Sequence, residues 1–376
     1  MFERIKHMLI KEFLQIFRDF RMRGIIFVMP VVQLVVFSYA MASDVRIVAL
    51  AVFDLDKTPL SRQVISTLVG SGYFNVVGHI HDDIGAQDLL DKGKAQAIIR
   101  MNPGFEGQVK AGRTAPIQLL LDGTETTNSM IINQYIVRIL SDLNRGILLD
   151  RISRQTGTKI QKGVVELRNR AWFNENYDNI NFFVPGVMIV IVTLVSLMLT
   201  AMAIVREKEI GTMEQIMVSP ITPFEFILGK TFPFALIGMV DVVIVMIVGV
   251  FWFEIPLRGE IYLLFLATAL FLLTTLGIGL FISTISKTQQ QALMSTFFFF
   301  QPAIFLSGFA FPIANMPTII QYFTYLNPLR YFLIIVRGVF LKGSDFSILW
   351  PEFAALLVMG IFILWSASRR FQKTLS

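Results

Sequence analysis

Long stretches without a single charged side chain dominate this sequence. Such runs occupy 24–43, 179–205 and 261–286, and Asp241 alone interrupts another at 231–253. A helix needs about 20 mainly apolar residues to cross the hydrocarbon core of a bilayer. Charged residues make up 16% of the chain, against about 25% in ordinary soluble domains. The pattern therefore predicts an integral membrane protein.

The charge-free run at 288–329 is about twice as long as one crossing requires. Proline punctuates it from Pro302 onward, so we predict a span only over about 290–310. The segment 311–340 is expected to form short broken helices that dip into the outer leaflet. Irregular backbone at that depth is tolerated when it packs against protein or lines a cavity. A further span is expected near 349–368.

The distribution of Lys and Arg over the short loops indicates the orientation of these spans. Basic residues are concentrated in 1–23, in the loop after residue 205, at Lys287 and after residue 368. Positive loops face the cytoplasm, so we predict an all-α polytopic membrane protein with six transmembrane helices and both termini cytoplasmic. The alternative, an extra crossing within 311–340, would place the C-terminus outside.

Residues 1–23 show apolar side chains at helical spacing with Lys and Arg between them. This pattern is typical of an interfacial helix that lies on the cytoplasmic face. Packing of the same apolar face against protein is the alternative, and the two are compatible.

Residues 44–178 have ordinary polarity and are expected outside, as a periplasmic domain inserted between the first two spans. Strand and helix patterns alternate along it, which predicts a small α/β domain. The expected strands are 46–53, 74–79, 95–100 and 117–121, and the expected helices are 60–69, 86–92 and 127–153.

Asp54 and Asp56 directly follow the first of these strands. The sequence Phe53–Thr58 resembles the first motif of haloacid-dehalogenase-type phosphatases, in which the two carboxylates act as nucleophile and general acid/base. The later Lys and the distal acidic pair of that family have no clear counterpart here. The alternative is a strand-to-helix turn in which Asp56 or Thr58 caps the next helix. A membrane-anchored periplasmic hydrolase or phosphatase that uses Asp54 and Asp56 is the second functional hypothesis, and a scaffold or sensor of periplasmic ligands is a third.

Two other patterns are weaker. His79 and His81 share a strand face, but two histidines without a further ligand do not define a metal site. Leu228–Thr231 ends like a phosphate-binding loop, yet the loop's first glycine would fall at Phe224. The chain is therefore expected to bind no metal, cofactor or nucleic acid and to lack its own ATPase site.

Polar or aromatic residues within the spans are candidates for a translocation pathway. A carboxylate such as Asp241 is unfavourable inside a membrane and marks a functional position by default, although it can also be satisfied within the helix bundle. The remaining candidates are Phe297, Phe298, Phe299, Phe300 and Pro302.

Three segments together resemble the ABC-2 permeases of bacterial ABC exporters, in the branch with a large external domain between the first two spans. The matching segments are 172–186, 206–230 and 311–338. Their order, and their places relative to the spans, carry the resemblance. Asn174-Glu175 departs from it, because the family often has Asn-Pro at that place.

The resemblance implies a permease half-transporter in the bacterial inner membrane that exports hydrophobic or amphipathic small molecules. The partners that it implies are a separate cytosolic ABC ATPase, which uses ATP and Mg, and a second permease copy or paralogue in membrane lipid. It leaves open a periplasmic adaptor. It assigns a coupling helix near 206–218 that sits in the ATPase, with Arg206, Glu207, Lys208, Glu209, Gly211, Thr212 and Glu214. In the outer segment it points to Pro312, Asn315, Pro317, Pro328, Arg330 and Arg337.

Overall fold

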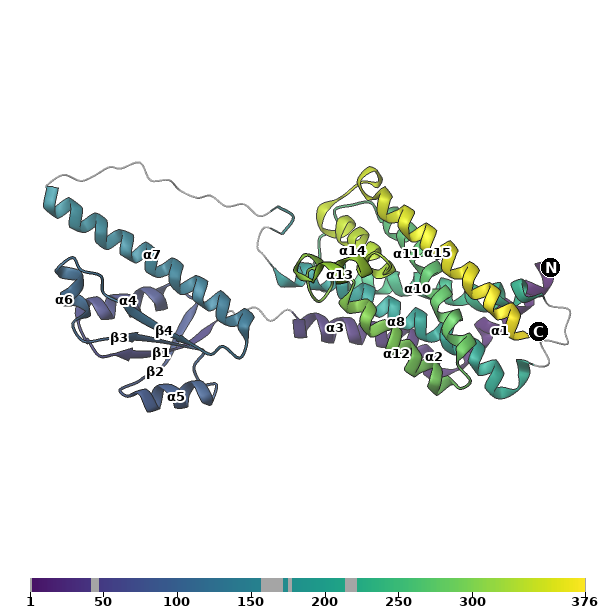
Figure 1. Cartoon of the computed structure of the whole chain (residues 1–376), viewed down its shortest axis with the longest axis horizontal. Helices are drawn as coiled ribbons and strands as arrows, with labels where there is room; N and C mark the ends of the chain where they lie inside the picture. Colours follow the sequence, from purple (N-terminus) through teal and green to yellow (C-terminus); the bar gives the residue numbers. More distant parts are fainter. Residues whose placement is uncertain (1, 42–46, 157–171, 175–177, 214–221, 376) are drawn as a thin grey trace. The chain divides into compact units, whose positions relative to one another are not determined.

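The chain folds into two compact units (Figure 1). One unit combines residues 1–43 with 169–376, and the other consists of 44–168. The computed structural model describes residues 2–41, 47–156, 172–174, 178–213 and 222–375.

The first unit is helical. Five of its helices are long and apolar enough to cross a membrane: Gly24–Met41, Asn179–Ile210, Glu225–Phe251, Ile261–Ile285 and Phe346–Arg369. In chain order the unit contains α1 (Phe2–Arg18), α2 (Phe20–Arg23), a π-helical turn (Gly24–Val28), α3 (Met29–Met41), α8 (Asn179–Ile210), α10 (Pro223–Phe251), α11 (Ile261–Ile285), α12 (Gln289–Phe305), a 3₁₀ turn (Ile313–Asn315), α13 (Thr318–Thr324), α14 (Pro328–Arg337), a second π-helical turn (Gly338–Lys342) and α15 (Phe346–Leu375).

Helix α8 forms the centre of this unit. It contacts α3, α10, α11, α12 and α14, and 72% of its most apolar window is buried. The corresponding fraction is only 22% for Gly24–Met41 and for Phe346–Arg369. The latter helices therefore leave most of their apolar surface for lipid or for another protein.

The run at 288–329 is broken after α12. This helix has 17 residues and contains Pro302, so it is slightly shorter than a standard span. Beyond it the backbone turns at Gly308, where φ is +84°, and continues as the 3₁₀ turn, α13 and α14. The broken helices expected over 311–340 are thus present, whereas their depth in a membrane and a sixth span remain predictions.

Helix α1 has two apolar faces. Met8, Glu12 and Ile16 lie one turn apart and are buried against the rest of the unit. Ile10, Leu14 and Phe17 are about half exposed. One face therefore packs on protein and another is free to contact lipid, so the two interpretations of the N-terminal helix are compatible.

The second unit contains a four-stranded sheet with the order β2-β1-β3-β4. β1 is parallel to both β2 and β3, and β4 is antiparallel to β3. The elements are β1 (Val48–Asp54), α4 (Pro59–Gly70), β2 (Phe74–His79), α5 (Asp83–Asp91), β3 (Ala97–Met101), α6 (Phe105–Lys110), β4 (Ile117–Leu121) and α7 (Thr126–Thr156). The strands and the long helix predicted from alternating patterns are therefore confirmed, and α6 is an element that the sequence analysis missed.

The two faces of this sheet carry different helices (Figure 1). Val48, Leu50 and Val52 of β1 point to a core shared with α4, α6 and α7. Ala51 and Phe53 point to a second core shared with α5. This alternation follows from the two-residue period of a strand, and it places α4 and α7 side by side on one face.

Asp54 and Asp56 hold the carboxyl end of β1 to the helices that follow. The carboxylate of Asp54 accepts hydrogen bonds from the Ser61 Oγ, at 2.6 Å, and from two backbone N–H groups. Asp56 accepts backbone N–H groups of Gly104, Phe105 and Glu106 at 2.7–3.0 Å, and so caps α6. Both carboxylates are thus occupied structurally, but Asp56 caps α6 and not the next helix, α4. The N-cap of α4 is Thr58, whose Oγ1 accepts from the backbone N–H of Ser61 at 3.4 Å, so the interpretation in which Thr58 caps the next helix is confirmed. The phosphatase hypothesis is not supported.

We expect Asp56→Ala to lower the stability of the second unit by about 1 kcal/mol, the usual effect of losing an N-cap. Burial raises the pKa of Asp56, but the hydrogen bonds from Thr58 and from the backbone of 104–106 outweigh it and leave the pKa below its usual value of 3.8. The stabilisation is therefore complete above that value and is lost as the pH falls through the lower folded-state pKa. Thermal unfolding of the full chain and of the variant, from pH 7 to pH 3, measures this pH-dependent stabilisation by Asp56. An acid-dependent loss of the same size in the variant would contradict the assignment.

Candidate functional site

A buried charge cluster joins three helices of the first unit. Lys230 lies in the second turn of α10 and is 2% exposed. Its Nζ is 2.6 Å from Oε1 of Glu207, in the last turn of α8, and 2.7 Å from Oε1 of Glu12, in α1. The two carboxylates are 4% and 3% exposed. We call Glu12, Glu207 and Lys230 the buried charge cluster.

The cluster extends to the surface through Lys11 and Thr212. Lys11 Nζ donates to Oε1 of Glu207 at 3.1 Å, and its side chain is 53% exposed. Thr212 Oγ1 donates to the other carboxylate oxygen of Glu207. Two acidic and two basic groups therefore meet here, which offsets much of the cost of removing each charge from water.

Helix α1 can approach α10 closely because position 229 is glycine. A Cβ on Gly229 would come 2.5 Å from Sδ of Met8. Next to it, Lys230 enters the charge cluster and Thr231 Oγ1 donates to the carbonyl of Ile227 at 2.8 Å. The Gly-Lys-Thr sequence that resembles the end of a phosphate-binding loop thus serves helix packing and ion pairing.

The start of α10 is fixed by a second set of polar contacts. Thr222 and Glu225 form a reciprocal capping box, which satisfies two N–H groups of the first turn. Arg4 of α1 also lies 3.5 Å from Oε2 of Glu225. Two ion pairs therefore connect α1 to α10, one between Arg4 and Glu225 and one between Glu12 and Lys230.

The predicted coupling residues are only partly brought together. Arg206, Glu207, Lys208 and Glu209 belong to the C-terminal end of α8 and not to a separate helix, because α8 continues to Ile210. Gly211 ends it with φ +81°, a conformation that glycine adopts without strain. Glu214 and 215–218 lie outside the described residues.

These residues divide into buried and exposed members. Glu207 is paired inside the chain, and Lys208 Nζ donates to the carbonyl of Ser283 at 2.9 Å. Glu209 is exposed and accepts from the backbone N–H of Gln289 at 3.3 Å. Ile210 follows it at 62% exposed. The surface open to a partner is thus formed by Glu209, Ile210 and Gly211, and sequence reasoning had missed Ile210.

Sequence reasoning also missed Glu12 and the buried position of Lys230. Glu12 stands on the buried face of α1 between Met8 and Ile16, and Lys230 stands at the edge of a charge-free run. Opposite charges on the apolar faces of two separate helices were the signal available. The signal does not say which helices are neighbours.

The candidates for a translocation pathway lie in different places. Asp241 of α10 is fully buried, and neither carboxylate oxygen has a hydrogen-bond partner among the described residues. Phe297, Phe298 and Phe299 of α12 are 42–76% exposed, whereas Phe300 is buried. Pro302 lies within the same helix.

An apolar cavity of about 340 Å³ adjoins α12. It is lined by Phe299, Phe300, Asn327 and Pro328, among others. Asn327 Nδ2 donates to the carbonyl of Ala303 at 2.7 Å and so connects the broken segment to α12. The structure therefore places two of the candidate phenylalanines in one cavity wall and leaves Asp241 outside it.

In the broken segment, two arginines rest on aromatic rings. The guanidinium of Arg330 lies 3.9 Å from the ring centre of Tyr325, and that of Arg337 lies 3.9 Å from the ring centre of Phe182. Pro312 and Pro317 immediately precede the 3₁₀ turn and α13, and Pro328 begins α14. Asn315 ends the 3₁₀ turn.

Five candidate spans, short broken helices between the last two of them and an α/β unit inserted after the first are together the features of a polytopic membrane permease. The sequence matches the family described as ABC-2 family transporter protein over residues 21–369, and the chain belongs to that family.

Relatives from Escherichia coli match along nearly their whole length. The chain is 32% identical to the probable multidrug ABC transporter permease YbhS over 98% of this chain and 97% of the relative. It is 29% identical to the probable multidrug ABC transporter permease YbhR, over 96% and 95%. The inner membrane transport permease YhhJ is also 29% identical, over 91% and 92%.

Proposed function

We propose that the chain is the membrane-spanning subunit of an ATP-driven exporter. It moves hydrophobic or amphipathic small molecules out of the cytoplasm or the inner leaflet, and a separate ATPase chain supplies the energy. The buried charge cluster carries this proposal, because its ion pairs connect α1, α8 and α10. The connection lies at the C-terminal end of α8, where we propose that the ATPase acts. The names of YbhS and YbhR, which describe probable multidrug ABC transporter permeases, support the substrate class.

The proposed coupling runs from the surface inward. A partner that pushes on Glu209, Ile210 and Gly211 acts on the end of α8. Glu207 is two residues away and is paired with Lys230 and Glu12, so α8 cannot shift without moving α10 and α1. A buried ion pair transmits displacement because separating its charges in a medium of low dielectric constant is unfavourable.

This chain has Phe224 where a phosphate-binding loop needs its first glycine. In this proposal ATP and Mg are therefore bound by the partner ATPase. A second copy or a paralogue of this chain would cover the exposed apolar faces of the outer helices. The cavity lined by Phe299 and Phe300 of α12 is the proposed contact surface for apolar substrate.

The orientation is tested by reporter fusions. Fusions at Asp122 and Arg258 are expected to report the periplasm, and fusions at Glu209 and Ser376 the cytoplasm, because basic loops are retained inside. Alkaline phosphatase and green fluorescent protein activities give the two readouts. A C-terminus that reports the periplasm would contradict the six-span arrangement.

Coupling is tested at the exposed end of α8. We expect Ile210→Arg and Gly211→Trp to leave the chain folded, since Ile210 is 62% exposed and a Cβ at Gly211 meets no atom within 4 Å. Both should reduce the ATPase that co-purifies from membranes with the tagged chain, or uncouple its hydrolysis from efflux. Tryptophan at 211 must also adopt a positive φ, which adds local strain.

Ile261→Arg is the matched control for this experiment. Ile261 is 45% exposed at the opposite end of the unit, where α11 begins. It should retain the ATPase and normal efflux. Normal association and efflux in both coupling variants would show that this end of α8 is only a connector.

A further inference from the structure

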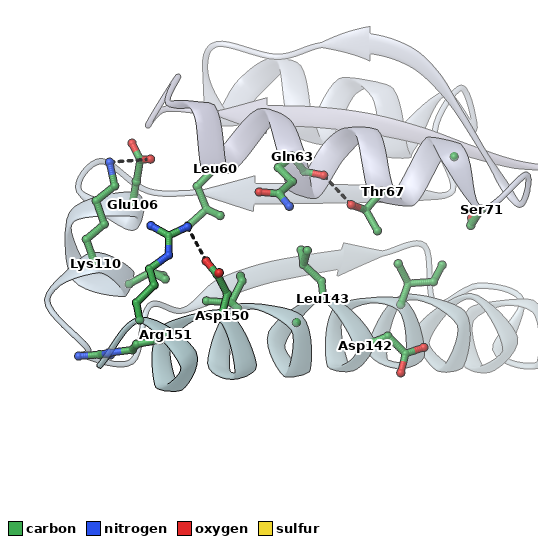
Figure 2. Close-up of a pocket in the computed structure, with 16 residues that line it drawn as sticks. Leu60, Gln63, Thr67, Ser71, Glu106, Lys110, Asp142, Leu143, Asp150 and Arg151 are labelled. Atoms are coloured by element: carbon green, nitrogen blue, oxygen red, sulfur yellow. Dashed lines mark hydrogen bonds and ion pairs between the residues drawn. The ribbon is translucent and has the colours of Figure 1, made fainter. Parts of the chain in front are cut away.

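Two hollows flank the second half of α7 in the second unit. The larger one lies on the side of α4 and has a volume of about 1080 Å³. Glu106 pairs with Lys110 at its edge at 3.0 Å (Figure 2), and Asp150 pairs with Arg154 at 2.7 Å. These charges compensate one another, so this pocket does not indicate a charged ligand.

The second hollow lies on the side of α6 and β4 and has a different charge balance. Its volume is about 590 Å³, within the range of sites that hold small molecules. Arg113 and Arg151 are the charged residues that line it, and none of the described carboxylates does so. The walls therefore carry two positive charges that they do not compensate. We call this second hollow the cationic hollow.

The guanidinium of Arg151 lies against the backbone of Gly112. A Cβ at position 112 would come 2.0 Å from Nη2 and 2.3 Å from Nη1 of Arg151, so any other side chain there would displace the charged group. Arg151 borders both hollows, whereas Gly112 lines only the cationic hollow. The positive charge of Arg151 therefore belongs to the cationic hollow.

Arg113 follows Gly112 directly and supplies a second cation at the same end of the hollow. Its side chain is exposed. Within the described ranges, neither Arg113 nor Arg151 has an ion pair or a side-chain hydrogen bond. Two like charges that lie close together without a counter-ion repel each other. An anion bound at this end would remove the repulsion and neutralise both groups.

The rest of the cationic hollow is mainly apolar. Phe105, Val109 and Ile117 line it from α6 and β4, and Leu143 and Ile147 line it from α7. The uncharged polar residues of the lining are Thr114, Ser141 and Asn144. A ligand that fits the hollow therefore combines an apolar body with a negatively charged group at the arginine end.

We propose that the cationic hollow binds a phosphate monoester with an apolar body. The phosphate lies at Arg113 and Arg151. The body lies against Val109, Leu143 and Ile147. A phosphate monoester carries nearly two negative charges at neutral pH, which matches the two arginines, and guanidinium groups can donate paired hydrogen bonds to its oxygens. The proposal concerns equilibrium binding to the second unit and does not depend on the coupling proposed above.

The test uses the full chain in phosphatidylcholine nanodiscs at pH 8, without nucleotide. Four probes separate the charged group from the body: 1-naphthyl phosphate, 1-naphthalenesulfonate, 1-naphthol and inorganic phosphate. Isothermal titration, corrected with empty nanodiscs, should show saturable binding of one 1-naphthyl phosphate per chain, about tenfold tighter than each of the other three probes. Absence of binding beyond empty nanodiscs, or an affinity equal to that of the sulfonate or the alcohol, would overturn the proposal.

The phosphate can belong to a membrane lipid or to a soluble molecule, and a second titration distinguishes these sources. It repeats the measurement in nanodiscs that contain phosphatidate. A lipid that occupies the hollow would weaken the binding of 1-naphthyl phosphate, whereas binding is unchanged if the ligand is soluble. Both results support a phosphate site and differ only in the molecule that supplies the phosphate.

Charge substitutions test the two arginines. Arg113→Gln and Arg151→Gln should each weaken the binding of 1-naphthyl phosphate about tenfold, because each removes one charge-assisted contact. Arg145→Gln is the matched control and should bind normally, since Arg145 is exposed on the same helix and lines neither hollow.

Filling each hollow in turn locates the site. Ser141 lines only the cationic hollow, so Ser141→Trp should prevent binding. Gly146 lines only the other hollow, and a Cβ there meets no atom within 4 Å, so Gly146→Leu should bind normally. Thermal unfolding shows whether each variant is folded, and Arg113→Gln is decisive if Arg151→Gln is not. Unchanged binding in folded Arg113→Gln, or binding lost in Gly146→Leu and retained in Ser141→Trp, would overturn the proposal.

Discussion

Lys230→Met is expected to destabilise the helical unit by about 3 kcal/mol and to abolish transport. The substitution leaves two buried carboxylates, Glu12 and Glu207, with only the half-exposed Lys11 beside them. Removing one partner of a buried ion pair typically costs about 3–5 kcal/mol, and Lys11 offsets part of that cost. Thermal unfolding in detergent and cellular efflux measure the two effects.

A triple variant separates stability from transmission. Glu12→Gln, Glu207→Gln and Lys230→Met together remove every charge of the buried charge cluster, and such neutral replacements are often as stable as the ion pairs that they replace. We expect the triple variant to regain most of the stability and to remain deficient in efflux. Lys287→Met, at an exposed position, is the control for the loss of one positive charge in the single variant Lys230→Met. Normal efflux in the stable triple variant would show that the cluster only holds the fold.

The buried position of Glu207 changes the result expected for a charge reversal there. Taken as a surface carboxylate that meets the ATPase, Glu207→Lys should leave folding intact. The structure buries Glu207 2.6 Å from Lys230, so a lysine there would place two cations side by side. The variant is therefore a test of folding, and Ile210 and Gly211 are better positions at which to test association.

Gly279→Leu should prevent normal assembly of the helical unit. A Cβ at Gly279 would lie 2.7 Å from Cβ of Thr200 and 3.3 Å from the backbone nitrogen of Ala201. Thr200 is β-branched and buried, and its hydroxyl donates to the carbonyl of Ser196 at 2.7 Å, so it cannot turn aside. Small residues let membrane helices approach closely. Overpacking at this contact between α8 and α11 should cost about 3 kcal/mol.

Fluorescence-detected size exclusion of the full chain measures this effect as loss of the monodisperse peak. Gly24→Leu is the matched control, since a Cβ there has no neighbour within 4 Å. Gly279→Ala should show an intermediate loss. A monodisperse Gly279→Leu protein with wild-type unfolding temperature would contradict the close contact of α8 and α11.

Local patterns predicted most of the secondary structure. Apolar runs with at most one charged residue located the five apolar helices, and two-residue alternation located β2 and β4 at the observed residues. These patterns were informative because crossing a bilayer requires a continuous apolar run, whereas burial of one sheet face requires alternation along the strand. The short helix α6 was missed because its cap, Asp56, lies about fifty residues earlier in the sequence.

The candidate site was predicted less completely than the fold. The end of α8 was identified from its charges and its place after a span. Its division into a buried half and an exposed half depends on α1, which is nearly two hundred residues away in the sequence from Glu207. Pairing across such a separation is set by tertiary packing, and helical periodicity within one segment carries no information about it.

The buried carboxylate of Asp241 has a consequence for the protein's evolution and engineering. A charge or an unpaired polar group inside an apolar bundle lowers stability, and leucine at this position would pack with the surrounding helices without that cost. A chain optimised for heat resistance alone would not keep an aspartate here. Position 241 is therefore the first place to seek a more stable permease by mutation. Any gain in thermal stability there should be weighed against the rate of transport.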